Sequence, residues 1–271
     1  LRLHPEVPAE KLRVADANEV LAKFDLPQFD AEQMAEEVLT AFARLAPHIA
    51  NVIPMLHKAW KDGNTILFEG AQGSLLDVDF GTYPFVTSSN TTAGGSCTGS
   101  GLPPTSIQRV IGVCKAYTTR VGSGPFPTGD EGLSEYLHNL GREFGATTGR
   151  PRGCGWLDTV LLRFACMING VTGLAITNLD GLDEYDTLKI CTAYDIDGTV
   201  VDLPPADRDA WDRAVPIYEE LPGWKVDTTA CRNYDELPAN AKAYLTRFAE
   251  LCDAPVAFVG VGPDREQTIV A

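Results

Sequence analysis

The chain has 271 residues, 44% of them hydrophobic, and a formal net charge of −15 at pH 7. This hydrophobic content is enough for a sizeable core and argues against disorder. The negative charge, with no basic cluster longer than the pair Arg150 and Arg152, disfavours nucleic acid or an anionic membrane as a partner. An anionic small-molecule substrate would then depend on a few arginines in loops.

Cysteine usage and the N-terminal sequence bear on the compartment. The seven cysteines are scattered, with no C-x-x-C pair and no Cys/His cluster, which favours reduced thiols over a disulfide framework or a zinc site. We find no signal peptide and no apolar run long enough to span a bilayer, so we expect a cytoplasmic protein. The chain begins at Leu1 instead of methionine, and we therefore expect an N-terminal portion to be absent.

Residues 1–62 form a predicted helical segment. From Asp30, apolar residues recur at spacings of three or four, which predicts an amphipathic helix with Asp30 as its N-cap. Pro47 is expected to divide the helix, and Gly63 to end it. This segment shows no residue pattern that carries chemistry, so we assign function to residues 63–271, which we expect to form a single α/β domain.

Strand and helix patterns alternate along the rest of the chain. Predicted strands lie at 66–68, 116–121, 174–177 and 256–259. Predicted helices lie at 106–115, 133–144, 156–168 and 237–251. A hairpin is predicted with strands at 188–194 and 200–201 around Asp197-Gly198. This order predicts an α/β fold with a mainly parallel central sheet and flanking helices, in which ligands bind at the carboxyl ends of the strands.

Glycines flank Gln72 directly after the first predicted strand. Gly70 and Gly73 allow a sharp turn and the close approach of a ligand, and the glutamine amide can hydrogen-bond to a neutral base edge. The run 87–95 is dense in hydroxyls, small residues and backbone N–H groups, which suits phosphate and ribose. Such a run alone is more often a polar surface loop, but its position beside Gln72 favours ligand binding.

Two further loops carry charge. The loop 145–153 holds Arg150 and Arg152 between glycines, and a planar guanidinium grips carboxylate or phosphate in a bidentate way, although two arginines alone more often form an exposed basic loop. Asp180 follows the predicted strand 174–177. A carboxylate there can accept hydrogen bonds from the N1–H and 2-amino groups of guanine, a pair of donors that adenine lacks. The common alternative for Asp180 is an Asx turn or a helix cap.

Several long sequence words resemble the adenylosuccinate synthetase family and occur in its order. They are GAQGSLLDVDFGTYPFVTSSNTTAGG, KAYTTRVGSGPFPT, EFGATTGRPR-x-x-GWLDT and GPDRE. The resemblance runs from about Gly63 to the C-terminus. It implies a P-loop NTPase-like fold, incomplete at its N-terminus, with a small hairpin-containing C-terminal part. The implied activity is a GTP-dependent carbon–nitrogen ligase that joins IMP and L-aspartate to adenylosuccinate in AMP biosynthesis. In that reaction GTP phosphorylates the 6-oxygen of IMP, and the aspartate amine then displaces the phosphate.

The resemblance also implies roles for individual residues. Gln72 is implied to be catalytic by holding the 6-oxygen of IMP, with Thr87, Val121 and Arg150 as further IMP contacts. The implied aspartate-binding loop consists of Ala146, Thr147, Thr148, Gly149, Arg150, Pro151 and Arg152. The implied GTP site consists of Arg152, Asn178, Leu179, Asp180, Gly260, Val261 and Gly262.

The chain departs from the family pattern in several ways. The family often has an unbroken arginine run where this chain has Pro151 and Gly153, and usually a lysine in place of Asn178. The family's phosphate loop, which supplies an aspartate base and the Mg²⁺ ligand, has no counterpart here, and neither does its catalytic histidine. We therefore expect no metal ligands in this chain, Mg²⁺ binding in a missing N-terminal segment, and no activity from this chain alone.

The resemblance implies that the full-length enzyme is a homodimer. Two alternative functions stay open at this point. One is a related ligase that acts on a modified purine nucleotide such as dGMP, and the other is a non-catalytic nucleotide-binding fragment.

Overall fold

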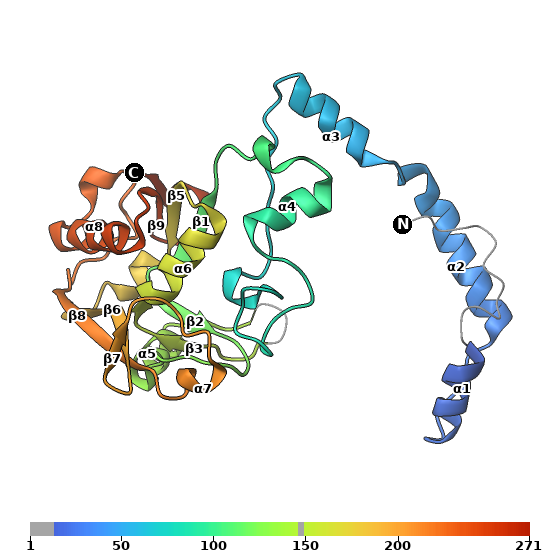
Figure 1. The fold of residues 1–271 in the computed structure, drawn as a ribbon, viewed down its shortest axis with the longest axis horizontal. Helices are drawn as coiled ribbons and strands as arrows, with labels where there is room; N and C mark the ends of the chain where they lie inside the picture. The colour runs from blue at the N-terminus through green and yellow to red at the C-terminus, as the bar shows by residue number, and fades with distance from the viewer. Residues whose placement is uncertain (1–13, 146–148) are drawn as a thin grey trace. The chain divides into compact units, whose positions relative to one another are not determined.

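The computed structural model describes residues 14–145 and 149–271 (Figure 1). The chain divides into two compact units, one up to Lys58 and one from Ala59 to Ala271. The first unit holds the helices α1 (Val14–Ala22), α2 (Ala31–Leu45), the 3-10 helix η2 (Ala46–His48) and most of α3 (Val52–Lys61). The second unit contains every sheet found in the described residues.

The helical pattern predicted from Asp30 is confirmed. The Asp30 side chain caps α2 by accepting hydrogen bonds from the backbone N–H groups of Glu32 at 2.8 Å and Gln33 at 2.9 Å. Pro47 lies in η2, which separates α2 from α3. Gly63, with a φ of 80°, follows the end of α3, as expected for a helix C-terminus.

The stretch Ala31–Lys61 is also long and apolar enough, by length and composition alone, to cross a membrane. This finding corrects the expectation that the sequence contains no such run. Core helices of globular proteins and N-terminal signal sequences pass the same test, and here η2 interrupts the stretch. Length and composition therefore do not by themselves assign a membrane span.

A four-stranded sheet forms the centre of the second unit. Its order is β1 (Ile111–Lys115), β5 (Gly173–Thr177), β9 (Val256–Gly260) and β10 (Thr268–Val270). The first three strands run parallel, and β10 is antiparallel to β9. The register pairs Lys115 with Thr177 and Ile176 with Val259. The predicted α/β fold with a mainly parallel central sheet is confirmed.

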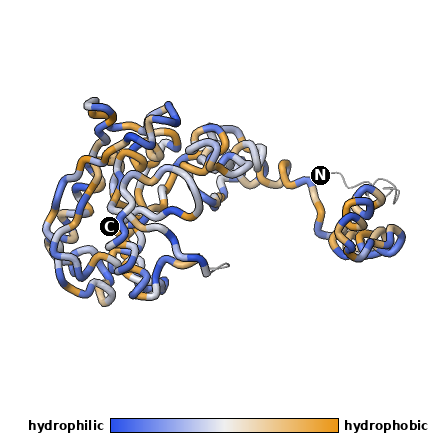
Figure 2. Tube along the Cα trace, turned by 90° about the horizontal axis from the view of Figure 1, so that it is seen from below, coloured by the Kyte–Doolittle hydropathy of each residue, from blue (hydrophilic) through white to orange (hydrophobic). Residues whose placement is uncertain are grey.

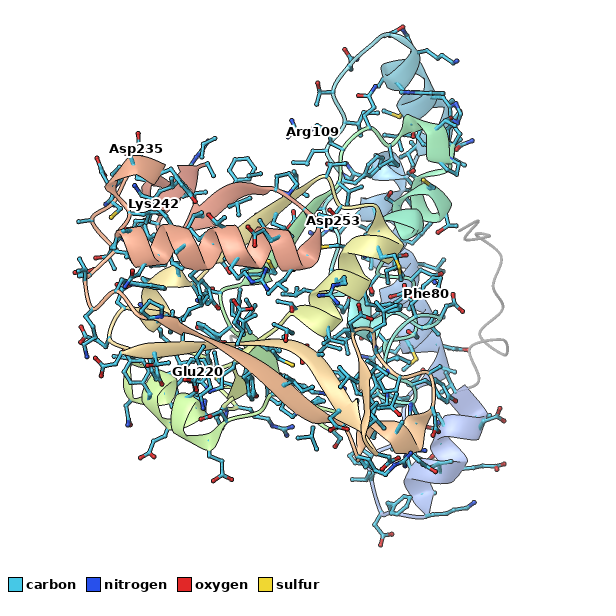
Figure 3. The ribbon with its side chains drawn as sticks, turned by 60° about the vertical axis from the view of Figure 1, so that its left-hand side comes forward. Phe80, Arg109, Glu220, Asp235, Lys242 and Asp253 are labelled. Atoms are coloured by element: carbon cyan, nitrogen blue, oxygen red, sulfur yellow. The ribbon has the colours of Figure 1, made fainter. Side chains whose placement is uncertain are left out.

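Two helices, α6 (Thr159–Asn169) and α8 (Ala239–Cys252), pack against each other in this unit. Figure 3 shows α8 lengthwise, from Lys242 near its start to Asp253 at its C-cap. The side chains of Tyr244 and Phe248 from α8 are buried in the same core as Ile176 from β5. Figure 2 shows hydrophobic residues interspersed with hydrophilic ones along the tube of this unit, as expected where each element turns one side to the core.

A second sheet is built on the long strand β6 (Thr187–Ile196). Strand β6 pairs in parallel with β4 (Leu157–Asp158), and it pairs antiparallel with β7 (Thr199–Val201) and β8 (Val215–Pro222). The predicted hairpin is confirmed, because Asp197 and Gly198 at its turn have φ of 55° and 82°, the signs that a type I′ turn needs. The strand β8 was not predicted, because its sequence VPIYEELP combines two prolines with two acidic residues.

Shorter elements complete the second unit. They are β2 (Thr118–Arg120), β3 (Gly153–Gly155), α4 (Ala93–Ser100), α5 (Glu131–Asn139), α7 (Arg208–Trp211), and the 3-10 helices η3 (Ser74–Leu76), η4 (Pro104–Ser106), η5 (Leu179–Leu182), η6 (Tyr234–Glu236) and η7 (Arg265–Gln267). The strand expected at 116–121 is reduced to β2, which pairs antiparallel with β3. The helix expected at 133–144 ends early, since Gly141 and Glu143 have φ of 71° and 60°.

Two predicted elements are wrong. Residues 106–115 form no α-helix: Ser106 ends the 3-10 helix η4, and residues 111–115 are strand β1. There Gly112 packs so closely on Val171 that a Cβ would come within 3.2 Å of it, a close approach typical of a strand glycine. Residues 66–68 form no strand with any described residue, and Leu67 is 91% exposed. Three apolar residues without a hydrogen-bonded neighbour do not constitute a strand.

Candidate functional site

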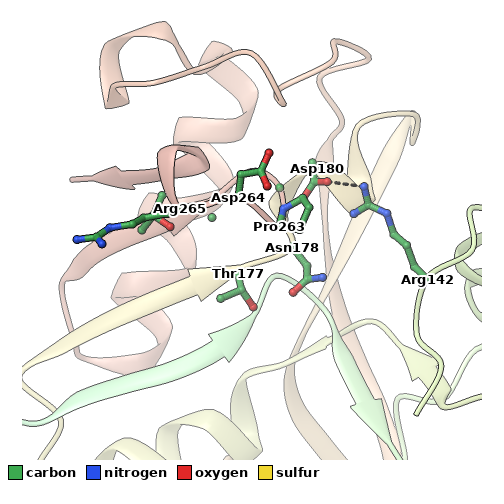
Figure 4. A pocket seen from close by; sticks show the side chains of 10 residues that line it. Arg142, Thr177, Asn178, Asp180, Pro263, Asp264 and Arg265 are labelled. Carbon is green, nitrogen blue, oxygen red and sulfur yellow. Dashed lines mark hydrogen bonds and ion pairs between the residues drawn. The ribbon is translucent and has the colours of Figure 1, made fainter. Parts of the chain in front are cut away.

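A pocket of about 460 Å³ lies where β5 and β9 end (Figure 4). Thr177 and Gly260 are the last residues of these strands. One wall is formed by Thr177, Asn178 and Asp180, with Arg142 beside them. The other wall is formed by Gly260, Gly262, Pro263, Asp264, Arg265 and Thr268. The carboxyl ends of parallel strands are the usual ligand-binding edge of an α/β sheet.

The carboxylate of Asp180 is the most deeply buried charged group of this pocket. Its side chain is 2% exposed, against 29% for that of Arg142. Oδ2 accepts a hydrogen bond from the Arg142 guanidinium, which raises the pKa of Arg142. Oδ1 has no hydrogen-bond partner among the described residues. A buried carboxylate oxygen without a donor is costly, so Oδ1 marks a position where a ligand donor would be stabilising.

Packing around η5 directs Asp180 toward the pocket. Asn178 turns the chain out of β5 with a φ of 60°, in the left-handed region that asparagine tolerates better than most residues. Leu179 is fully buried, and Gly181 lies so close to Tyr117 that a Cβ would come within 2.9 Å of its ring. The Asp180 carboxylate caps no backbone N–H in the described chain, since Oδ2 pairs with Arg142 and Oδ1 with no group.

The opposite wall is held in place by Gln267. Its side chain folds over Gly262, where an added Cβ would come within 2.2 Å of Oε1. Oε1 accepts a hydrogen bond from the Asp264 N–H at 3.1 Å, and Nε2 donates to the Thr229 carbonyl at 3.0 Å. The N–H of Val261, whose side chain is fully buried, donates to the Gln267 carbonyl at 2.9 Å. This wall therefore presents fixed glycine backbone to the pocket.

A second charged cluster centres on Glu143, the residue after Arg142. Its carboxylate accepts hydrogen bonds from Lys115 Nζ at 2.5 Å and Tyr117 Oη at 2.7 Å, with Arg152 Nη1 at 3.4 Å. Burial alone would raise the pKa of Glu143, but the hydrogen bonds from Lys115 and Tyr117 outweigh it and hold the pKa below its ordinary value. Arg152 Nε is buried without a partner among the described residues, so this guanidinium retains a donor for an anion.

Asp77 organises the long loop that follows Gln72. Its buried carboxylate accepts hydrogen bonds from four backbone N–H groups, those of Asp79 at 2.9 Å, Phe80 at 3.1 Å, Thr91 at 2.6 Å and Thr92 at 3.2 Å. Burial alone would raise the pKa of Asp77, but these four donors outweigh it and lower the pKa. The loop thus has a fixed conformation although it lacks regular structure.

The loop at Gln72 and the hydroxyl-rich run 87–95 are joined by hydrogen bonds. Thr91 Oγ1 donates to the Gly73 carbonyl at 2.7 Å, and the Thr87 N–H donates to the Leu76 carbonyl at 2.7 Å. Gln72 itself is exposed, with a φ of 62°. The structure therefore places Gln72 on the surface of the second unit, one residue from a carbonyl that anchors the run.

Four of the residues expected to bind guanine lie together in one pocket, unlike the residues expected to bind IMP or aspartate. Those that line the pocket are Asn178, Asp180, Gly260 and Gly262. The side chains of Leu179 and Val261 are buried in the core, and Arg152 belongs to the Glu143 cluster. Most of the described residues expected to bind IMP or aspartate are exposed: Gln72, Val121, Gly149, Arg150 and Pro151. Thr87 is half-buried. Ala146, Thr147 and Thr148 lie outside the described residues.

Arg142 was missed by sequence reasoning. It lies 38 residues before Asp180, and no local pattern indicates that the two side chains meet. Figure 4 shows its side chain directed at Asp180, whereas the guanidinium of Arg265 points away from it. Lys115 and Tyr117 lie within the quoted word KAYTTRVGSGPFPT but carried no predicted role.

The residues that could bind a metal ion are scattered in the described chain. Within residues 14–145 and 149–271, no group of three or more His, Cys, Asp or Glu side chains is placed to hold a metal ion. The described residues therefore do not fit Mg²⁺, and we derive no chemical step through it.

Comparisons with known proteins agree with one another. A family model described as adenylosuccinate synthetase matches residues 3–269. The adenylosuccinate synthetase of Moorella thermoacetica is 53% identical over 259 residues, which cover 95% of this chain and 61% of that protein. The enzyme of the same name from Bifidobacterium longum subsp. infantis is 50% identical over 270 residues, which cover 98% of this chain and 62% of that protein.

A solved structure described as fully ligated adenylosuccinate synthetase from Plasmodium falciparum superposes with a TM-score of 0.88 at 33% identity. The match covers 97% of this chain and 64% of that chain. The chain thus spans 61% and 62% of the length of the two bacterial relatives.

Proposed function

This chain belongs to the adenylosuccinate synthetase family, and from that premise we propose that it serves a GTP-dependent ligase that joins IMP and L-aspartate to adenylosuccinate in AMP biosynthesis. In this proposal GTP phosphorylates the 6-oxygen of IMP, and the aspartate amine displaces the phosphate. The pocket at the ends of β5 and β9 receives the guanine base. The protein is further proposed to be cytoplasmic and to act as a homodimer.

The single observation that carries the guanine assignment is the Asp180 carboxylate. It is almost fully buried, lines the pocket and has one oxygen with no donor among the described residues. The N1–H and 2-amino groups of guanine are adjacent donors that match the two oxygens of a carboxylate. Adenine presents an acceptor at N1, which a carboxylate repels. At Gly260 and Gly262 the opposite wall presents backbone that carries no side chain of its own toward the pocket.

Other residues take the roles that the family resemblance assigns. Gln72, in the loop anchored through Gly73, holds the 6-oxygen of IMP as negative charge develops there. Thr87, Val121 and Arg150 are proposed IMP contacts. The loop 146–152 receives aspartate, and Arg152, whose Nε has no partner among the described residues, supplies a cation between aspartate and the nucleotide phosphates.

The substitution Asp180→Asn in the protein as encoded tests the guanine assignment. It removes a charged acceptor and introduces an amide donor that faces the donors of guanine, so kcat/KM for GTP should fall at least tenfold relative to that for ATP, as expected when a charged hydrogen bond is lost.

Asp183→Asn is a matched control for that experiment. Asp183 is equally buried and follows η5, but its carboxylate accepts hydrogen bonds from Trp224 Nε1 at 2.6 Å and the Thr228 N–H at 2.7 Å. It should lower the Tm and leave the GTP/ATP ratio unchanged. If Asp180→Asn behaves in the same way as this control, Asp180 does not read the base.

A further inference from the structure

Arg142 and Asp180 meet inside the proposed base pocket in a way that bears on ligand choice. Both residues line the pocket, and the Arg142 guanidinium donates to Asp180 Oδ2. The neighbouring Oδ1 has no partner among the described residues although the Asp180 side chain is only 2% exposed. The two oxygens of this carboxylate are therefore inequivalent: Oδ2 accepts from a donor of the protein, whereas Oδ1 is buried without a donor among the described residues.

The chemistry of the two donors is closely related. A guanidinium presents planar N–H groups in a fork that fits a carboxylate. The N1–H and 2-amino edge of guanine is part of a cyclic guanidine and presents the same two adjacent donors. A base with both donors needs both oxygens of Asp180, including the one to which Arg142 donates. A base with N1–H alone, such as hypoxanthine, needs only Oδ1.

We propose that Arg142 is a specificity-determining residue that competes with the 2-amino group of the purine for Asp180 Oδ2. This inference rests on the proposed guanine site. Hypoxanthine nucleotides bind with the Arg142–Asp180 hydrogen bond kept, whereas guanine nucleotides displace it. Arg142 thereby reduces the advantage that the 2-amino group would otherwise confer on guanine over hypoxanthine.

The position of Arg142 makes such displacement feasible. Its side chain is 29% exposed, so the released guanidinium can be solvated. It follows the turn at Gly141, which has a φ of 71°, and lies outside the regular helix α5, which ends at Asn139. The guanidinium also feels the charge of Asp183, whose carboxylate accepts from Trp224 and Thr228. Displacement of Arg142 therefore leaves Asp183 with its own donors.

The test measures dissociation constants of GDP, inosine diphosphate and ADP for the protein as encoded by isothermal titration calorimetry. Arg142→Met keeps the aliphatic stem and removes the donors. Its lost positive charge weakens GDP and inosine diphosphate equally, so the ratio of their dissociation constants isolates the competition. That ratio should shift toward GDP on the order of three- to tenfold, the range for one charge-assisted hydrogen bond of a partly exposed residue.

Two further variants serve as an intermediate case and as a control. Arg142→Gln retains one neutral donor and should give an intermediate shift; it also keeps the test decisive if Arg142→Met folds poorly because Asp180 is left buried and unpaired. Arg247→Met breaks a comparable arginine–carboxylate pair, that of Arg247 on α8 with Glu219 on β8 at 2.9 Å, and should leave the ratio unchanged.

Asp180→Asn distinguishes the failure of this inference from the failure of the proposed function. If it abolishes the preference for GDP while Arg142→Met and Arg142→Gln leave the GDP/inosine diphosphate ratio constant or shift it toward inosine diphosphate, the competition is refuted and the guanine site stands. If Asp180→Asn alters neither the GDP/ADP nor the GDP/inosine diphosphate ratio, the guanine site itself is refuted, and the inference with it.

Discussion

Asp158 offers a prediction about stability that depends on pH. The carboxylate is completely buried at the N-cap of α6. Tyr194 Oη donates to its Oδ2 at 2.6 Å, and the Leu161 N–H donates to Oδ1 at 3.2 Å. Burial raises the pKa of Asp158 from 3.8 to about 6, and these hydrogen bonds offset only part of that effect.

The sign of the effect follows from linkage. Because the folded-state pKa lies above the unfolded-state value, the folded protein binds a proton more tightly between these two values. The resulting stabilisation is complete below pH 3.8, is lost as the pH rises through about 6, and is absent at neutral pH. The difference between a pKa of 3.8 and one of about 6 corresponds to roughly 3 kcal/mol of stability, because solvent does not screen this fully buried carboxylate.

Asp158→Asn removes this titration while keeping an acceptor for Leu161 and Tyr194. Urea denaturation between pH 4 and pH 7 gives the free energy of unfolding of the wild type and the variant. Their difference should move in favour of the variant by roughly 2.5 kcal/mol over this interval, because the unfolded chain is already partly deprotonated at pH 4, whereas the exposed Asp212→Asn should track the wild type. A difference that stays constant within about 0.5 kcal/mol, the usual error of such comparisons, would refute the reasoning.

Three further substitutions test other parts of the structure. Asp77→Ala leaves four backbone N–H groups without their acceptor and should lower the free energy of unfolding by about 2–4 kcal/mol, with faster proteolytic cleavage between residues 77 and 92; unchanged cleavage would contradict the assigned role. Glu143→Gln removes the charge that pairs with Lys115 and Arg152 and should raise the KM for aspartate more than the KM for GTP. Equal effects on both KM values would argue against a link between Glu143 and the aspartate loop. Asn178→Lys should strengthen the binding of GTP and ATP alike, because the apolar lysine stem can cover either base. It should also lower the Tm, since a φ of 60° costs lysine about 1 kcal/mol more than asparagine. A raised Tm would show that the backbone relaxes.

Elements with strong local signals were predictable. The strands β5 and β9 are short apolar runs, the turn Asp197-Gly198 has the residues that positive φ requires, and α8 has a clear helical period. Segment 106–115 was not predictable, because Ile107, Val110, Ile111 and Cys114 fit helical spacing as well as a strand. The pairing of Ile111–Lys115 with β5, a strand distant in sequence, decides between the two.

The site shows the same division between local chemistry and distant contacts. A carboxylate after an apolar strand is visible in the sequence, but that signal fits a helix cap as well as a base-reading group, and only the resemblance to the family favoured Asp180 as a base-reading residue. The difference depends on the left-handed backbone of Asn178 and the buried Leu179, which leave the carboxylate with no backbone N–H among the described residues to cap. The role of the carboxylate there also depends on its partner Arg142, which comes from the separate segment that follows α5. Asp180 therefore functions as one of a pair with Arg142. The effect of substituting either residue includes the effect of leaving the other without its partner.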